Sequence, residues 1–249
     1  EDRLVTTPHF VGVIDGATGG EKIDGRAGGI VAAETVANVL THLSAEATAK
    51  DFISQASDAM AKISGDAIHS YRRPTASILV WSSYHQQLWR LGDSLAALDN
   101  VPWLTPYKEI DAITGGFRAA LVRAWTGFNI TSLDILQNRD KAREIITSLL
   151  EVQSFFSNNP HDRLGYGVID GTPVPDKFLE IISTQDVKEI VLCSDGFISP
   201  ANTLSNAQEE LASMLVTDPL CIREYESTKG LQPGAVSFDD ATYVRIIQN

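Results

Sequence analysis

The stretch Phe-Val-Gly-Val-Ile-Asp-Gly, residues 10–16, places a run of apolar residues directly before an acidic turn. A short apolar run that ends at turn residues is typical of a buried strand. Asp15 is therefore expected at the end of such a strand. Because Asp-Gly is also ordinary turn chemistry, this stretch indicates a functional site only if other strands end in the same way.

Other predicted strands do carry acids at one end: Asp93, Asp195, and the neighbours Asp239 and Asp240. Carboxylates gathered around one point repel each other and cannot all stay ionised. Divalent cations between them would relieve that repulsion. Oxygen ligands suit Mg²⁺ or Mn²⁺, whereas zinc normally takes His or Cys, and the five histidines here show no paired spacing. The pattern predicts a hard-metal site.

Hydrophobic periodicity predicts the remaining elements, which are amphipathic helices, a hairpin and further strands. The predicted helices span 32–43, 52–67, 110–128, 134–156 and 204–216. The predicted strands span 10–14, 75–82, 87–92, 165–169, 188–193 and 241–247. No linker-like run divides the 249 residues, so one domain is expected.

Composition excludes several classes of partner. The chain has 32 acidic against 20 basic residues, a formal net charge of −12, and its longest basic cluster is Arg72 and Arg73. A nucleic acid or an anionic membrane surface would need a clustered basic face. No apolar stretch reaches the roughly 18–20 residues of a spanning helix. Cys193 lies in a predicted buried strand, so with two cysteines we expect no disulfide framework and a cytoplasmic protein without a visible leader.

Several short motifs follow one another from Glu1 to about residue 246. They are Glu1-Asp2, Val13-Ile14-Asp15-Gly16 with Gly19-Gly20, Gly92-Asp93-Ser94, Cys193-Ser194-Asp195-Gly196, and Ser237-Phe238-Asp239-Asp240-Ala241-Thr242. Their order and spacing resemble the metal-dependent protein phosphatases of type 2C. The resemblance implies an α+β fold, a four-layer αββα sandwich with two central antiparallel β-sheets flanked by helices. It also implies a single domain over 1–249, with a helical insertion, or flap, at about 108–160.

The resemblance implies a chemistry as well. Asp15 would bridge two divalent ions, Mg²⁺ or Mn²⁺; Glu1 and the Gly16 carbonyl would complete the site of one ion. Asp195 and Asp239 would hold the other. Two ions about 4 Å apart acidify a water between them and stabilise charge on a transferring phosphoryl group. The implied activity is hydrolysis of phosphomonoesters, and the implied substrate is a protein phosphorylated on Ser or Thr.

Two further roles follow from the same resemblance. Asp2 would orient the attacking water, so Asp15 and Asp2 are the expected catalytic residues. Asp93, with Asp195, would match the place where some members bind a third, weaker ion. Near the C-terminus the motif favours Asp239 as the metal ligand, and its neighbour Asp240 remains the alternative.

The chain departs from the family pattern close to the predicted site. Ala17 stands where animal members usually carry a His proposed as general acid, and the family's phosphate-binding Arg would lie upstream of Glu1. Loss of a general acid typically costs about 10²- to 10⁴-fold in rate. A catalytically weak or inactive regulatory or docking module of the same fold is therefore the alternative function.

Two other enzyme classes share a short motif with this chain. Gly92-Asp93-Ser94-Leu95 matches the opening block of a lipase and esterase family with Ser94 as nucleophile, but the late His that such a serine needs is absent. The stretch 13–18 resembles the nucleophile motif of haloacid-dehalogenase-type phosphatases, but Ala17 replaces their second Asp. Both alternatives lack a residue that their chemistry requires.

Overall fold

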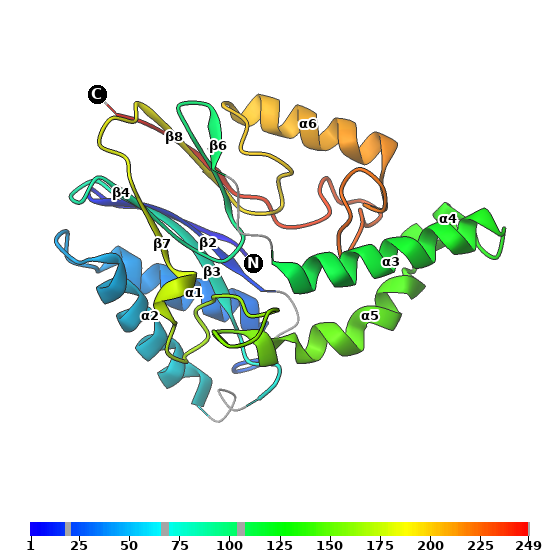
Figure 1. The fold of residues 1–249 in the computed structure, drawn as a ribbon, viewed down its shortest axis with the longest axis horizontal. Helices are drawn as coiled ribbons and strands as arrows, with labels where there is room; N and C mark the ends of the chain where they lie inside the picture. The colour runs from blue at the N-terminus through cyan, green and yellow to red at the C-terminus, as the bar shows by residue number, and fades with distance from the viewer. Residues whose placement is uncertain (18–20, 66–69, 104–107, 249) are drawn as a thin grey trace.

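Two antiparallel β-sheets packed face to face form the centre of the protein (Figure 1). The computed structural model describes residues 1–17, 21–65, 70–103 and 108–248. Within these ranges one sheet, in spatial order, consists of β1 (Arg3–Thr6), β2 (Phe10–Gly16), β3 (Ala76–Ser82), β4 (Gln87–Leu91) and β7 (Glu180–Ser183). The other consists of β6 (Val101–Trp103), β5 (Leu95–Leu98), β8 (Glu189–Cys193) and β9 (Tyr243–Ile247).

Because side chains alternate along a strand, β2 contributes to two cores. Val13 is fully buried between the two sheets, whereas its neighbour Ile14 is fully buried on the opposite face, under the helices. Apolar side chains from both sheets complete the inter-sheet core: Leu79, Leu88, Ala96, Ile190 and Leu192. Full burial of one such large side chain contributes about 1.5–3 kcal/mol. The strand that ends in Asp15-Gly16 is therefore fixed on both faces.

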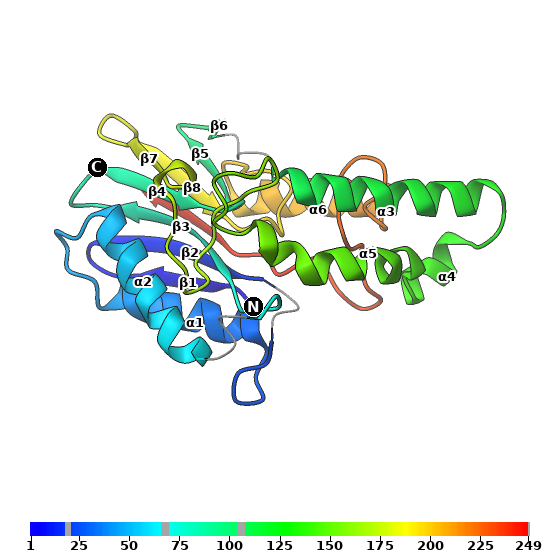
Figure 2. The same cartoon turned by 60° about the horizontal axis from the view of Figure 1, so that its bottom comes forward.

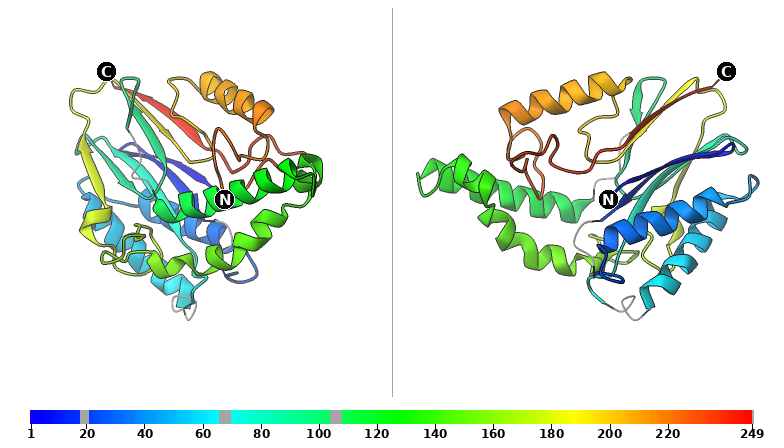
Figure 3. Two further views of the ribbon diagram at one scale, coloured as in Figure 1. Left: turned by 45° about the vertical axis from the view of Figure 1, so that its right-hand side comes forward. Right: turned by 180° about the vertical axis from the view of Figure 1, so that it is seen from behind.

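Helices cover the outer face of each sheet (Figure 3). The helices α1 (Gly28–Thr41) and α2 (Ala49–Ser64) pack on the first sheet, and α6 (Leu204–Thr217) packs on the second. At the start of α2, Thr48 and Asp51 form a capping box that satisfies free backbone amides of the first turn. The predicted α+β fold, a four-layer αββα sandwich, is thereby confirmed.

A helical arm extends from one end of the sandwich (Figure 2). It consists of α3 (Glu109–Gly127), α4 (Leu133–Asn138), α5 (Lys141–Val152) and the short 3₁₀ helix η2 (Gln153–Phe156). A second 3₁₀ helix, η3 (Asp176–Phe178), lies later in the chain, outside the arm. The fully buried Arg118 pairs with Asp140 at 2.6 Å and donates to the carbonyl oxygens of Leu220 and Ser227, each at 2.9 Å. These bonds fix α3 against the segment that precedes β9. No helix within the described ranges is both long and apolar enough to cross a lipid bilayer.

The structure corrects part of the predicted secondary structure. The strand expected at 165–169 is not formed; only the single bridges Ala76 to Ile169 and Ser157 to Tyr166 occur there. Strand β3 pairs with β2 along its whole length and with β4 from Ile78 onward, so only its first two residues have a free edge for this segment. The helix expected over 134–156 is divided, because Asp140 accepts a bond from the Arg143 amide and starts a new helix. Strands β1, β5, β6 and β7 were not predicted.

Candidate metal centre

Asp15 and Asp195 meet at the end of the sandwich from which the arm extends. Asp15 is the penultimate residue of β2 in one sheet, and Asp195 lies two residues beyond β8 in the other. Each carboxyl group is among the causes of the other's pKa shift, so the two lie in close contact. Two carboxyl groups can share a hydrogen bond only if one carries a proton. Within the described ranges neither forms an ion pair with a basic side chain. The pair therefore needs a proton or another cation between its oxygens.

The electrostatics of this pair have identifiable causes. Burial, with the negative charges of Asp195, Asp2 and Asp93, raises the pKa of Asp15 well above its ordinary value. Burial, with the charges of Asp93 and Asp239, raises the pKa of Asp195 to about 7. Raised carboxyl pKa values mark a site where negative charge is uncompensated. A divalent cation is the ligand class that such a site favours.

Three oxygen atoms converge beside Gly29, the second residue of α1. A Cβ atom placed on Gly29 would lie 2.6 Å from the Ala17 carbonyl oxygen, 2.8 Å from Glu1 Oε2 and 2.9 Å from the Gly16 carbonyl oxygen. Any side chain at this position would fill the space between them. Glycine therefore lets three oxygen atoms lie close to the start of α1, and oxygen donors are the ligand chemistry of Mg²⁺ and Mn²⁺.

One carboxylate oxygen of Asp2 accepts a hydrogen bond, and the other has no hydrogen-bond partner among the described residues. Its Oδ2 accepts a hydrogen bond of 2.6 Å from the Ser194 hydroxyl, and that hydroxyl oxygen accepts another of 2.9 Å from the Thr242 amide. Its Oδ1 is buried and has no hydrogen-bond partner among the described residues. A buried carboxylate oxygen without a partner calls for a water or an ion. Asp2 is thus fixed with one acceptor available.

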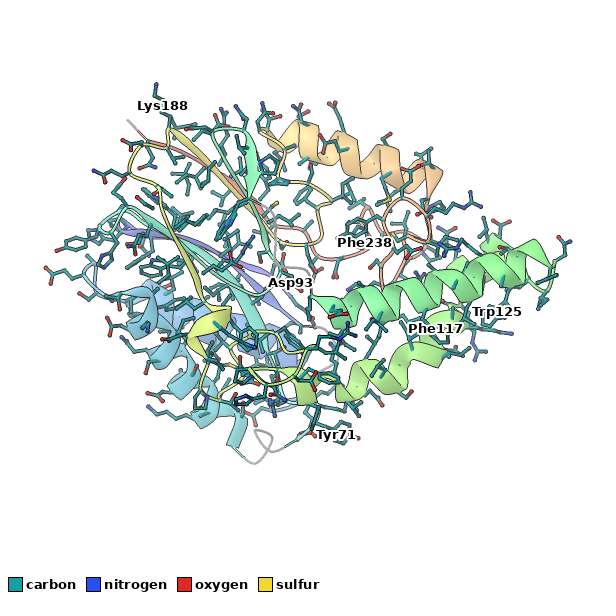
Figure 4. All side chains as sticks on the ribbon, viewed as in Figure 1. Tyr71, Asp93, Phe117, Trp125, Lys188 and Phe238 are labelled. Atoms are coloured by element: carbon teal, nitrogen blue, oxygen red, sulfur yellow. The ribbon has the colours of Figure 1, made fainter. Side chains whose placement is uncertain are left out.

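Asp93 contacts a lysine. It lies between β4 and β5, where the sheets approach the N-terminal end of α3 (Figure 4). Its Oδ2 is 3.5 Å from Lys108 Nζ, which is also 2.8 Å from Asp111 Oδ2 and 4.5 Å from the centre of the Tyr166 ring. Burial disfavours the ammonium, but Asp111 and Asp93 outweigh it and raise the pKa of Lys108 well above its usual value. Asp93 is therefore partly neutralised by a permanent positive charge.

Asp239 and Asp240 have different surroundings. Asp239 Oδ1 is 2.5 Å from Lys229 Nζ and accepts a bond of 2.9 Å from the Asp240 amide. The Asp240 carboxylate is 54% exposed and lies against the amino nitrogen of Glu1. Asp239, unlike Asp240, is among the charges that raise the pKa of Asp195. Of the two acids, Asp239 is the one that acts on the central pair.

Gly196 allows the loop after Asp195 to lie against the loop that carries Asp240. A Cβ atom on Gly196 would overlap the carbonyl oxygen of Asp240, so only glycine allows the loop after Asp195 to approach so closely. This contact explains the Asp-Gly pair at 195–196 better than a turn alone. The Gly19-Gly20 part of the first motif lies outside the described residues.

The site opens into a cleft of about 570 Å³ between the sandwich and the arm. Basic residues line it together with the acids: Arg72, Lys108, Arg143 and Lys229. As the side chains stand, no group of three or more acidic, His or Cys side chains in the described ranges has the geometry to hold a metal ion. The carboxylates thus converge in a pair, Asp15 and Asp195, with Asp93 and Asp239 drawn toward lysines.

The lysines were missed by sequence reasoning. Lys108 is carried to Asp93 by the packing of α3, and Lys229 reaches Asp239 from a loop that Arg118 anchors. Neither contact has a signal in the local sequence. The sequence shows that Lys108 lies just before a predicted helix, but it does not show that the side chain contacts Asp93.

The serine-hydrolase alternative finds no support. Ser94 is fully buried, and its hydroxyl has no hydrogen-bond partner among the described residues. A nucleophilic serine needs a base within hydrogen-bond reach and access to substrate. Ser94 has neither.

Comparison with known proteins gives similarity of structure but not of sequence. No protein-family model and no curated protein matches the chain. The chain is similar in structure to bacterial serine/threonine phosphatases. Among them is the Mycobacterium tuberculosis phosphatase PstP/Ppp, at 14% identity and a TM-score of 0.46, covering 100% of this chain and 92% of that one. Stp1 from Staphylococcus aureus is 12% identical, with a TM-score of 0.49, over 100% of this chain and 88% of that one.

A third similar structure contains metal. It is the catalytic domain of PstP in complex with two manganese ions, 15% identical with a TM-score of 0.42, over 85% of this chain and 77% of that one. Identities of 12–15% and TM-scores below 0.5 do not carry function from one protein to another. The chemistry has to come from the side chains of this chain.

Those side chains fit a divalent ion at one part of the site. Around Asp15 the donors are all oxygens, one acceptor of Asp2 is unpaired, and the central carboxyl pair is short of positive charge. This is the donor set of Mg²⁺ or Mn²⁺. At Asp93 the fit fails, because Lys108 already supplies a cation there.

Proposed function

We propose that this protein is a metal-dependent phosphatase that hydrolyses phosphomonoesters on phosphorylated Ser or Thr residues of proteins. The observation that carries the proposal is the Asp15–Asp195 pair. Two carboxyl groups, each from the end of a strand in a different sheet, lie in close contact, have raised pKa values and form no ion pair with a basic side chain in the described ranges. Such an arrangement costs stability, and bound divalent cations would offset that cost.

The proposed ligands divide between the two sheets. Glu1 and the Gly16 carbonyl oxygen would hold one Mg²⁺ or Mn²⁺, and Asp195 with Asp239 would hold another, with Asp15 between them. Bound divalent ions would lower the pKa of water and stabilise charge on the phosphoryl oxygens. For Asp239 to serve as a ligand, the Lys229 ammonium has to move away from its Oδ1.

The protein's own groups would prepare the water and the substrate. Asp2 Oδ1 is the acceptor that would orient the attacking water, and Ser194 fixes the carboxylate through its other oxygen. Basic residues on the cleft wall, such as Arg143, would attract the phosphate dianion. Ala17 cannot donate a proton, so we propose that solvent protonates the leaving group. That step limits the expected rate, since general acid catalysis is worth about 10²- to 10⁴-fold.

A regulatory or docking module of the same fold is the second candidate. Two observations favour it: the lysine contacts of Asp93 and Asp239, and the absence, in the described ranges, of a three-member group ready to hold a metal. Such a module would bind a phosphoprotein or a metal without turnover.

The test is hydrolysis of p-nitrophenyl phosphate and of a phosphothreonine peptide with Mn²⁺ or Mg²⁺ and with a chelator. We expect turnover that requires metal and falls at least about 100-fold in Asp15→Asn and Asp195→Asn. Asp58→Asn, an exposed acid on α2, is the matched control and should retain full activity. Wild-type turnover no higher than that of the two site variants, despite bound metal, would favour the docking module.

A further inference from the structure

Lys108 is enclosed by groups that fix its ammonium. Its side chain is 19% exposed, and its Nζ lies 2.8 Å from Asp111 and 3.5 Å from Asp93. The face of the Tyr166 ring is 4.5 Å away on another side, at a distance suited to a cation–π contact. The ammonium thus has negative or electron-rich partners from three different segments of the chain.

The backbone that carries Lys108 is fixed as well. Lys108 is the N-cap residue of α3, and the next residue, Glu109, pairs with Arg163 in the segment that also carries Tyr166. Further along α3, the buried Arg118 ties the helix to Asp140 and to the loop that precedes β9. An ammonium on so constrained a helix cannot withdraw easily from Asp93.

This position conflicts with a metal ion at Asp93. A Mg²⁺ ion bound by a carboxylate lies about 2.0–2.1 Å from the ligating oxygen, and the ammonium is 3.5 Å from Asp93 Oδ2. Two cations would then compete for one carboxylate at a separation where their repulsion is large, even in a partly polar environment. The expected third ion and Lys108 exclude one another at this corner.

We propose that Lys108 is the resident cation of the Asp93 corner. It takes the place that a third divalent ion would occupy, limits the centre to two ions, and positions the N-terminal end of α3 beside the reacting groups. The inference rests on the proposed function only in that the centre binds divalent ions.

The contrast with Lys229 sharpens the proposal. Lys229 contacts one carboxylate, Asp239, and is held by the loop before β9 rather than by a helix. Lys108 contacts two carboxylates and a ring. Lys229 can therefore be displaced by a metal ion, whereas Lys108 stays in place.

The experiment counts bound Mn²⁺ per chain by equilibrium dialysis and elemental analysis over a range of metal concentrations. We expect two ions in the wild type, and a third, weaker ion in Lys108→Met. Lys108→Arg, which keeps the positive charge, should bind two. Lys50→Met is the matched control, because Lys50 is an exposed lysine that also pairs with a carboxylate, Asp176. It should bind two ions, like the wild type.

Asp93→Asn alone covers the case in which Lys108→Met does not fold, which thermal melting would show. This variant should leave both ions bound. If Lys108→Met folds, adding Asp93→Asn to it should remove the third ion. Loss of an ion in Asp93→Asn alone, three ions in the wild type, or an unchanged count in folded Lys108→Met would overturn the inference while leaving the phosphatase proposal intact. A wild type that binds no Mn²⁺ would overturn both.

Discussion

The two halves of the candidate centre compensate their negative charge in different ways. At Asp15 and Asp195 two carboxyl groups lie in close contact, and the pKa values of both rise. Around Asp93 and Asp239 each carboxylate has a lysine within 3.5 Å. The first half is unsatisfied without an added cation, and the second is satisfied by the chain itself. From this difference we expect an added divalent cation to bind most strongly at Asp15.

The largest effect is expected from Asp195→Asn, which changes the half of the centre that lacks a lysine contact. Removing one carboxylate of the central pair should abolish the stabilisation that Mn²⁺ gives the wild type, and with it the activity. In the metal-free protein the same change should raise the melting temperature by a few degrees, because like-charge repulsion and the cost of burial are relieved. Calorimetric melting with metal and with chelator measures both effects. A variant that melts lower than wild type without metal would mean that the pair is structural.

A smaller effect is expected in the lysine-paired half. Lys229→Met removes the group that competes with a metal ion for Asp239 Oδ1, so Mn²⁺ should bind about tenfold more tightly, the scale of one charged hydrogen bond. Isothermal titration of Mn²⁺ gives the dissociation constant. Lys229→Arg retains the charge and should resemble the wild type. Weaker binding in Lys229→Met would show that the lysine supports the metal site rather than competing with it.

The smallest expected effect is a pH dependence of the metal-free protein. Asp195 titrates near its ordinary 3.8 in the unfolded chain and, because burial and acids raise its pKa, near 7 in the folded one. The folded state therefore binds more protons between these values, and stability falls as the pH rises from about 4 to about 7. We expect the melting temperature in chelator to fall by a few degrees between pH 5 and pH 8.

Two controls isolate the cause of that slope. Saturating Mn²⁺ should flatten it, because metal replaces the shared proton, and Asp195→Asn should reduce it. An equal slope in Asp195→Asn would assign the pH dependence to other groups.

The sequence predicts the Asp15–Asp195 half of the centre better than the lysine-paired half. The acids at 15 and 195 could be found because apolar strands ending in Asp-Gly are visible as a local pattern. The lysine contacts of Asp93 and Asp239 could not, because they depend on how α3 and the loop before β9 pack. That packing is set by Arg118, a residue with no local signal of its role. The strand predicted at 165–169 is wrong for a related reason: its composition is strand-like, but the segment bridges the first sheet only at Ala76.

The central claim is that Asp15 and Asp195 hold divalent ions while Asp93 does not. Anomalous diffraction from a crystal grown with Mn²⁺ tests it directly. We expect two manganese peaks, one between Asp15 and Asp195 and one beside Glu1 and the Gly16 carbonyl, with none at Asp93. A map without a peak at Asp15, or with Asp15 and Asp195 turned away from each other, would contradict it.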